Sequence, residues 1–118
     1  MATQKPTYIT AAVVTDDFTV TPVDLDASRT LDEFYRLINC RFVDVVALDE
    51  NLDMWVDDEG MCTGSTPNWA ITKVAQAYGF TAQPYFGTAI FTGGVDEDGN
   101  SVALTPAVLQ ALTDLVTA

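Results

Sequence analysis

Alternating apolar and polar residues open the chain and predict a β-hairpin. Residues 7–15 (YITAAVVTD) and 18–25 (FTVTPVDL) are rich in β-branched and aromatic residues and are joined at Asp16-Asp17. Two such runs separated by a short polar turn are typical of paired antiparallel strands. Pro22 has no amide hydrogen to donate to a neighbouring strand, so we expect the second strand at an edge of the sheet or at a bulge.

Four apolar residues after position 30 predict the first helix. They are Leu31, Phe34, Tyr35 and Ile38, and they recur at the i, i+3, i+4, i+7 spacing of one helical face. The preceding residues, Thr30-Leu31-Asp32-Glu33, fit a capping box, in which threonine and glutamate side chains bond the first free amides. We expect the apolar face of this helix to be buried.

Two short strands are expected next, at residues 42–48 and 52–56, around an Asp49-Glu50-Asn51 turn. The second of them alternates strictly between two kinds of side chain. Leu52, Met54 and Val56 share one face, and Asp53, Trp55 and Asp57 share the other. The pattern therefore indicates that Trp55 lies on an acidic, solvated face of the sheet.

Two further helices and one strand complete the predicted order. Thr66-Pro67 and Thr105-Pro106 each place a capping residue before a proline, which is well tolerated at the first helical position. Residues 85–94 predict a strand interrupted at Gly87, and the turn Asp96-Glu97-Asp98-Gly99 follows it. Strands interleaved with three helices indicate an α+β fold, with a small, mostly antiparallel sheet and the helices on one face.

The length and charge of the chain limit its organisation and its partners. Its 118 residues are expected to form a single domain, with an N-terminal hairpin (7–25), a core (30–104) and a C-terminal helix (105–117). Seventeen acidic residues against five basic ones give a net charge of −12. This charge disfavours direct binding to nucleic acid or to anionic membranes. It favours a positively charged partner, either a cationic patch on another protein or a metal ion, although a high net charge also serves simply to keep a protein soluble.

Neither the N-terminus nor the cysteines indicate export or a metal centre. The first residues lack the apolar region of a signal peptide, and no apolar run approaches the ~18 residues of a membrane span. Cys40 and Cys62 have neither the spacing of a redox motif nor that of a zinc site. We therefore expect a cytoplasmic protein with two reduced thiols.

The chain carries none of the patterns that indicate catalysis. It has no histidine, which is the commonest general base and metal ligand, and it has no nucleophile elbow, phosphate-binding loop or dinucleotide-binding motif. The turn starting at Asp96 has Ser101 and Ala107 where a calcium-binding EF-hand loop requires glycine and glutamate. We therefore expect a protein that is not an enzyme, with no catalytic residue, metal site or cofactor.

The order of these features resembles a family of small proteins of unknown function found in actinobacteriophages, other phages and mobile elements. The resemblance covers residues 30–104. Its matching positions are Leu31 and Glu33, Val43 to Leu48, Asp58-Glu59-Gly60, Pro67-Asn68, Gly93-Gly94 and Asp98-Gly99. One departure is Cys40-Arg41, where the family tends to have a small or glycine-containing pair. The resemblance implies a phage-type accessory protein that acts in the cytoplasm of a host bacterium, but it implies no activity.

The preferred functional hypothesis is binding to a host or phage protein. In this hypothesis Trp55 anchors the partner, because exposed tryptophan is enriched at interface hot spots. The acidic residues around the anchor are Asp53, Asp57, Asp58 and Glu59. Trp69 is a second exposed candidate. The competing interpretation buries both rings, with Trp55 covering the second face of the sheet and Trp69 lying beneath the loop at 61–67.

Two variants of this hypothesis remain open. The protein could associate with itself, because an edge strand at residues 18–25 offers unpaired backbone groups. Alternatively, its carboxylates could replace DNA phosphates and inhibit a DNA-binding enzyme, in the manner of anti-restriction proteins. Binding by a DNA mimic would weaken steeply as salt screens the charges, whereas binding through an apolar anchor would survive moderate salt.

Overall fold

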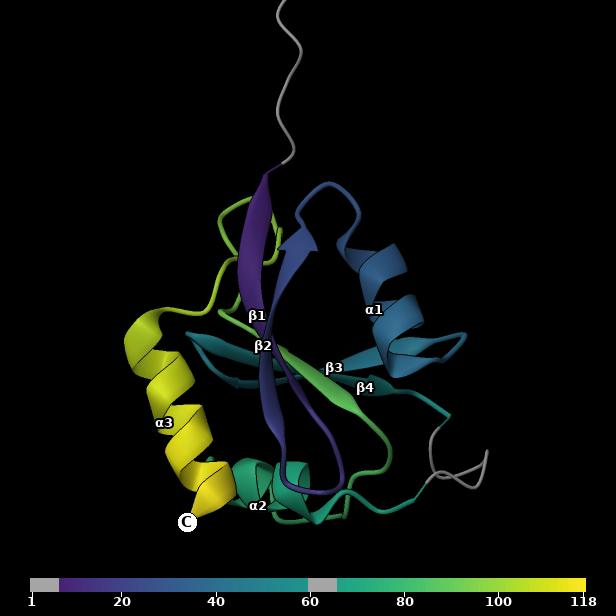
Figure 1. Ribbon diagram of the computed structural model, residues 1–118, viewed down its shortest axis with the longest axis vertical. Coiled ribbons are helices and arrows are strands. Elements are labelled where there is room, and N and C mark those ends of the chain that lie inside the picture. The colour runs from purple at the N-terminus through teal and green to yellow at the C-terminus, as the bar shows by residue number, and fades with distance from the viewer. Residues whose placement is uncertain (1–6, 60–65) are drawn as a thin grey trace, which may run out of the picture.

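The computed structural model describes residues 7–59 and 66–118, which form an α+β fold (Figure 1). In chain order, the elements of this part are β1 (Tyr8–Val14), β2 (Val20–Asp26), α1 (Thr30–Ile38), β3 (Val43–Asp49), β4 (Leu52–Asp57), α2 (Trp69–Ala77), β5 (Ala89–Thr92) and α3 (Pro106–Thr117). All the strand pairs are antiparallel, and the sheet has the order β2-β1-β5-β4-β3. The predicted fold class is confirmed. The residues Gly60 and Cys62, which the sequence analysis singled out, lie outside the described part.

The last strand in the chain occupies the centre of the sheet. β5 lies between the β1–β2 hairpin and the β3–β4 hairpin, so that Phe91 is paired with Ala12 on one side and with Met54 on the other. All four residues of β5 are buried. β2 and β3 are therefore the two edges of the sheet, and the expectation that the Pro22 strand lies at an edge is confirmed.

Helices cover both faces of the sheet, so the expectation of a single covered face is wrong. Figure 1 shows α1 on one side of the sheet and α3 on the other. Successive residues of a strand point to opposite faces, and β5 accordingly contributes Phe91 to one apolar core and Ile90 to the other. The sequence identified the apolar stripe of each helix, but it did not show which face each stripe covers.

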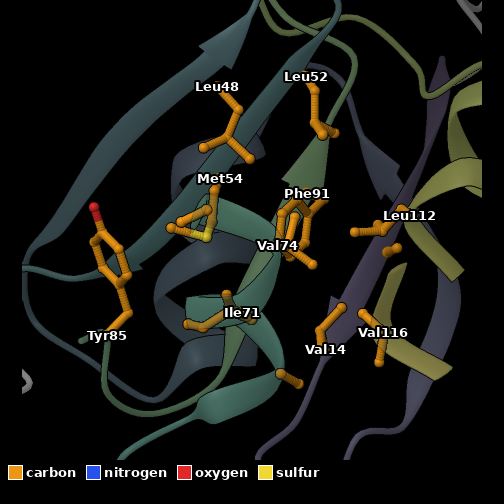
Figure 2. Packing of buried hydrophobic residues seen from close by; sticks show 14 of the residues in the cluster. Val14, Leu48, Leu52, Met54, Ile71, Val74, Tyr85, Phe91, Leu112 and Val116 are labelled. Carbon is orange, nitrogen blue, oxygen red and sulfur yellow. The ribbon is translucent and has the colours of Figure 1, made fainter. Parts of the chain in front are cut away.

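The larger core lies between the sheet and the pair α2 and α3. Figure 2 shows Ile71 and Val74 of α2, with Leu112 and Val116 of α3, gathered over residues from four strands. Those strand residues include Val14, Leu48, Leu52, Met54 and Phe91. The smaller core lies beneath α1, where Phe34 and Ile38 pack with Ile9, Ala11, Leu25 and Ile90.

Two of the predicted helix starts differ from those in the structure. Arg29, not Thr30, is the N-cap of α1, and no side chain caps this end. Glu33 accepts a hydrogen bond from Arg36 at 3.1 Å, so the predicted capping box does not form. The N-cap of α2 is Asn68 rather than Thr66. At α3 the predicted start is confirmed, because the Thr105 hydroxyl accepts a hydrogen bond from the amide of Val108 at 3.2 Å.

Candidate functional site

Trp55 lies beneath α1, so the expectation of a solvated tryptophan on β4 is wrong. Its ring stacks on Phe34 with the centroids 4.5 Å apart and the planes 28° from parallel. Its indole nitrogen donates a hydrogen bond to the hydroxyl of Thr92 at 3.1 Å. The structure therefore matches the competing interpretation, in which Trp55 covers the second face of the sheet.

Asp53 shares this face and is also withdrawn from solvent, with 6 % of its surface exposed. Its pKa is raised above the ordinary range, first because burial disfavours the charged carboxylate and second because Asp49 carries a like charge nearby. A buried carboxyl group with a raised pKa is poorly placed to attract a partner. Asp53 therefore contributes little to a binding surface.

The other three predicted acidic residues lie where β4 ends. Asp58 is exposed, whereas Asp57 and Glu59 are half-buried. The Asp57 carboxylate accepts a hydrogen bond from the amide of Glu59 at 2.9 Å, and Glu59 forms an ion pair with Arg41 at 3.3 Å. These acids are therefore held at one end of the sheet.

A cleft of about 360 Å³ opens at this end of the sheet. It is lined by Thr15, Asp16, Leu37, Ile38, Asn39, Asp57, Thr66, Gly87 and Thr88. Asp16 comes from the β1–β2 turn and Asp57 from the end of β4, and they meet here because β5 alone separates β1 from β4 in the sheet. Asp16 and Asp57 are far apart in the sequence, and only the strand order brings them together.

The β1–β2 turn, which contributes Asp16 to the cleft, also carries an unusual residue. Phe18 has a φ of 64°, in the left-handed region that a non-glycine residue rarely adopts. The amide of Thr15 donates to the carbonyl of Thr19, and the amide of Phe18 donates to the carbonyl of Thr15, each at 3.1 Å. These bonds define a three-residue hairpin loop, in which glycine usually occupies the left-handed position.

Side-chain bonds hold the same turn in place. The Asp17 carboxylate accepts a short hydrogen bond from the Thr15 hydroxyl and another from the Thr19 amide at 3.2 Å. The hydrogen bond from the Thr15 hydroxyl is the main reason that the pKa of Asp17 lies below its ordinary value. Asp17 therefore remains charged beside Phe18, whose ring is 42 % exposed.

Two further exposed aromatic residues lie at this end of the sheet. Phe42 precedes β3, and its carbonyl accepts a hydrogen bond from the amide of Asp58 at 3.0 Å. Trp69 is the first residue of α2. The preceding Asn68 fixes α2 here, because its side chain donates to the carbonyls of Val14 at 3.2 Å and Gly87 at 2.9 Å. In Figure 1 the tip of the β1–β2 hairpin lies beside α2.

These residues define what we call the cleft surface: Asp16, Asp17, Phe18, Phe42, Asp57, Asp58 and Trp69. Trp69 was identified from the sequence as an exposed candidate, and Asp57 and Asp58 as acids of a binding site. Phe18 and Phe42 were missed. The available signal was a phenylalanine directly after Asp16-Asp17, where a short hairpin loop favours glycine.

The acids of the cleft surface form no ion pair among the residues that the structure describes. Four of the five Lys and Arg residues belong to this part of the chain. The ion pairs are Arg29 with Asp32 at 3.7 Å, Arg36 with Glu33 at 3.1 Å and Arg41 with Glu59 at 3.3 Å. Lys73 donates a hydrogen bond to the main-chain oxygen of Ala118 at 2.6 Å. Asp16, Asp17, Asp57 and Asp58 are thus available to cations from outside.

A protein-family model, described as a domain of unknown function (DUF3846), matches residues 9–117. The chain belongs to the DUF3846 family. The match takes in most of the N-terminal hairpin and the whole of the C-terminal helix, beyond the segment 30–104 on which the resemblance rested. The expectation of a family of unknown function is confirmed. Comparison with curated proteins and with solved structures finds no match.

Other features of this DUF3846 domain bear on its chemistry. Within residues 7–59 and 66–118, no group of three or more Asp, Glu and Cys side chains is placed to hold a metal ion. Burial, and then the nearby charge of Asp57, raise the pKa of the half-buried Cys40 thiol, which disfavours the reactive thiolate. No helix in the part of the chain described is long and apolar enough to cross a membrane.

Proposed function

We propose that this DUF3846 protein is a non-enzymatic binding protein whose cleft surface holds a basic protein partner. The observation that carries the proposal is Phe18, an exposed aromatic residue in a left-handed backbone conformation. Left-handed backbone costs a residue other than glycine roughly 1–2 kcal/mol, and strain of this kind clusters at functional sites. Because the Phe18 side chain is exposed, burial of its ring within the protein offsets little of that cost.

Contact with a partner supplies the missing burial. Fully burying a phenylalanine side chain contributes about 1.5–3 kcal/mol, and aromatic residues are enriched at the centres of protein interfaces. Phe42 and Trp69 are exposed at the same end of the sheet as Phe18. Three exposed aromatic rings at one end of the sheet provide the anchors that a protein partner needs.

The charges of the cleft surface favour a partner rich in lysine and arginine. Asp16 and Asp57 line the cleft, and Asp17 and Asp58 are exposed beside it. Complementary charges accelerate encounter and select among partners, while the apolar contacts slow dissociation. The resemblance to phage accessory proteins favours a host or phage protein in a bacterial cytoplasm as this partner.

A binding role accounts for the cleft better than catalysis does. Thr15, Thr66 and Thr88 line the cleft together with Asp16 and Asp57, and the chain has no histidine to act as a base beside them. Catalysis by such a site would have to rely on carboxylates as the acid and the base, or on a threonine hydroxyl activated by a carboxylate. The Thr15 hydroxyl instead donates a hydrogen bond to Asp17, which stabilises the turn.

The test is an affinity capture from a nuclease-treated bacterial lysate with the wild type and Phe18→Gly. Glycine keeps the turn, because it adopts positive φ without strain, so the variant removes the ring and leaves the fold intact. The matched control is Tyr8→Ala, which removes a ring that is 59 % exposed at the opposite end of β1. We expect wild type and Tyr8→Ala to retain the same protein at moderate salt, and Phe18→Gly to lose it.

Two outcomes would contradict the proposal. Equal capture by Phe18→Gly and wild type would show that the cleft surface is not the binding site. Capture only of DNA-handling enzymes, equal in all forms and released as salt rises, would instead support a mimic of DNA phosphates.

A further inference from the structure

The two edges of the sheet differ in what their backbone offers. In an antiparallel pair, every second residue of an edge strand directs its amide and carbonyl away from its neighbour. The hydrogen bonds Thr15–Thr19 and Thr7–Ala27 close the β1–β2 pair at its two ends. With the register between them, the outward positions of β2 are Val20, Pro22, Asp24 and Asp26. Pro22 thus removes a donor from the middle of this edge, a common way to block further pairing.

The β3 edge has no such block. The amide of Asp58 donates to the carbonyl of Phe42, and the register then places Val43, Val45 and Ala47 at the outward positions. The backbone amide of Val45 donates a hydrogen bond to the side chain of Asp44 at 2.9 Å instead of to β4. This bond supports the outward direction of the Val45 backbone groups. Val43, Val45 and Ala47 therefore each direct both an amide and a carbonyl away from β4.

The side chains along β3 describe what could pair with it. Val45 lies opposite Trp55, so the two share the face covered by α1. Trp55 is half-buried there, whereas Val45 is 42 % exposed. An added strand would cover Val45 and continue the apolar layer outward from Trp55.

Carboxylates surround this edge. Asp44, the second residue of β3, is exposed; Asp58 lies beside the start of the strand, and Asp49 and Glu50 are exposed at its end. Pairing of β3 with a second copy of itself would bring these acids together between two chains that each carry −12. Like charges opposed across a sheet are destabilising, so a basic segment fits this edge and a second copy does not.

We infer that the β3 edge accepts an extended basic segment of a partner protein as an additional antiparallel strand. On binding, the Val45 amide exchanges the Asp44 carboxylate for a carbonyl of the incoming strand. Asp44 is then free to pair with a lysine or arginine. Main-chain bonds supply affinity in this mode of recognition, and alternate side chains supply specificity. The inference goes beyond the proposed function and does not depend on Phe18.

The test uses a short synthetic peptide in which lysine alternates with valine, followed through the amide resonances of the protein. We expect the peptide to shift and protect the amides of Val43, Val45 and Ala47. Val45→Pro removes the outward donor, as Pro22 does at the other edge, and should weaken binding about tenfold or more. Val45→Thr keeps the amide and a β-branched side chain, and it serves as the matched control.

Two further variants control the test. Asp44→Lys separates loss of binding from loss of folding, and Phe18→Gly separates the β3 edge from the cleft surface. Asp44→Lys leaves every backbone group in place but reverses the charge, and it should weaken binding of the lysine peptide and admit a glutamate–valine peptide. Phe18→Gly should bind the lysine peptide as the wild type does. Absence of binding at about 1 mM peptide, equal affinity for Val45→Pro and Val45→Thr, or dimerisation of the protein through β3 would each overturn the inference.

Discussion

The indole nitrogen of Trp55 donates a hydrogen bond to the hydroxyl of Thr92 at 3.1 Å, which joins neighbouring strands beneath α1. Thr92 is fully buried, and the ring of Trp55 stacks on Phe34. This arrangement makes Trp55 part of the structure of the sheet. A Trp55→Ala variant is therefore a test of stability and is unsuitable as a clean test of binding.

Replacing Thr92 by valine should lower the free energy of unfolding by about 1 kcal/mol, because the half-buried indole N–H loses its acceptor. In a Trp55→Phe background the same replacement should cost much less, since no N–H remains to be satisfied. Chemical denaturation of the two single variants and the double variant gives the coupling energy. A coupling energy of zero would show that the hydrogen bond contributes nothing to stability.

Phe18→Gly should stabilise the protein by about 1 kcal/mol, because glycine adopts the left-handed conformation without strain. Phe18→Ala is the control, since alanine removes the ring but retains the strain at a φ of 64°. Denaturation midpoints compare the two variants with the wild type. If Phe18→Gly proved less stable than Phe18→Ala, strain at this turn would be excluded.

The raised pKa of Asp53 should make the stability of the protein depend on pH. Its pKa in the folded state is raised by burial and then by Asp49, so the charged form is disfavoured in the folded protein relative to the unfolded chain. Stability should therefore fall as pH rises from the ordinary pKa of an aspartate through the raised one. Asp53→Asn should be more stable than the wild type at pH 7, and this advantage should shrink on acidification.

The pH dependence is measured as the difference in unfolding free energy between Asp53→Asn and the wild type across the acidic range. The pKa shift of Asp26 makes stability depend on pH in the opposite direction. Hydrogen bonds from the hydroxyl and then the amide of Ser28 lower its pKa, so its contribution is present above the ordinary pKa and is lost as pH falls. A difference for Asp53→Asn that is constant with pH would contradict the assigned pKa.

Asn68 should be among the most costly residues to truncate. It is fully buried, accepts a hydrogen bond from the amide of Ile71 at 3.1 Å and donates to the carbonyls of Val14 and Gly87. Asn68→Ala should destabilise the protein by about 3 kcal/mol, since both the helix cap and buried acceptors lose their partner. Thr66→Ala, at the cap position predicted from the sequence, should cost less than about 0.5 kcal/mol.

The sequence predicted the elements well because their signals are local. Alternation indicated the strand at 52–56, and helical spacing indicated the buried Phe34 and Ile38. The same alternation placed Trp55 and Met54 on opposite faces of the sheet, but it could not reveal that a helix covers the face of Trp55. Two apolar faces require two covering layers, and which helix supplies each layer depends on strand order.

The candidate site was less predictable because it also depends on the order of the strands. Asp57 and Asp58 were predicted as site residues because they lie close to Trp55 in the sequence. Asp16 joins them only because β5 enters the sheet between β1 and β4. The conformation of Phe18 depends on the length of the hairpin loop and its bonds to Thr15 and Thr19, which the residue pattern alone left open.

In the proposed function, the strained and exposed Phe18 serves partner binding and lowers the stability of the protein. The most direct measurement therefore pairs the unfolding free energy of Phe18→Gly with its capture of the partner that the wild type retains. We expect Phe18→Gly to be more stable than the wild type and yet to fail to hold the partner. A variant that is more stable and still retains the partner would contradict the proposed function.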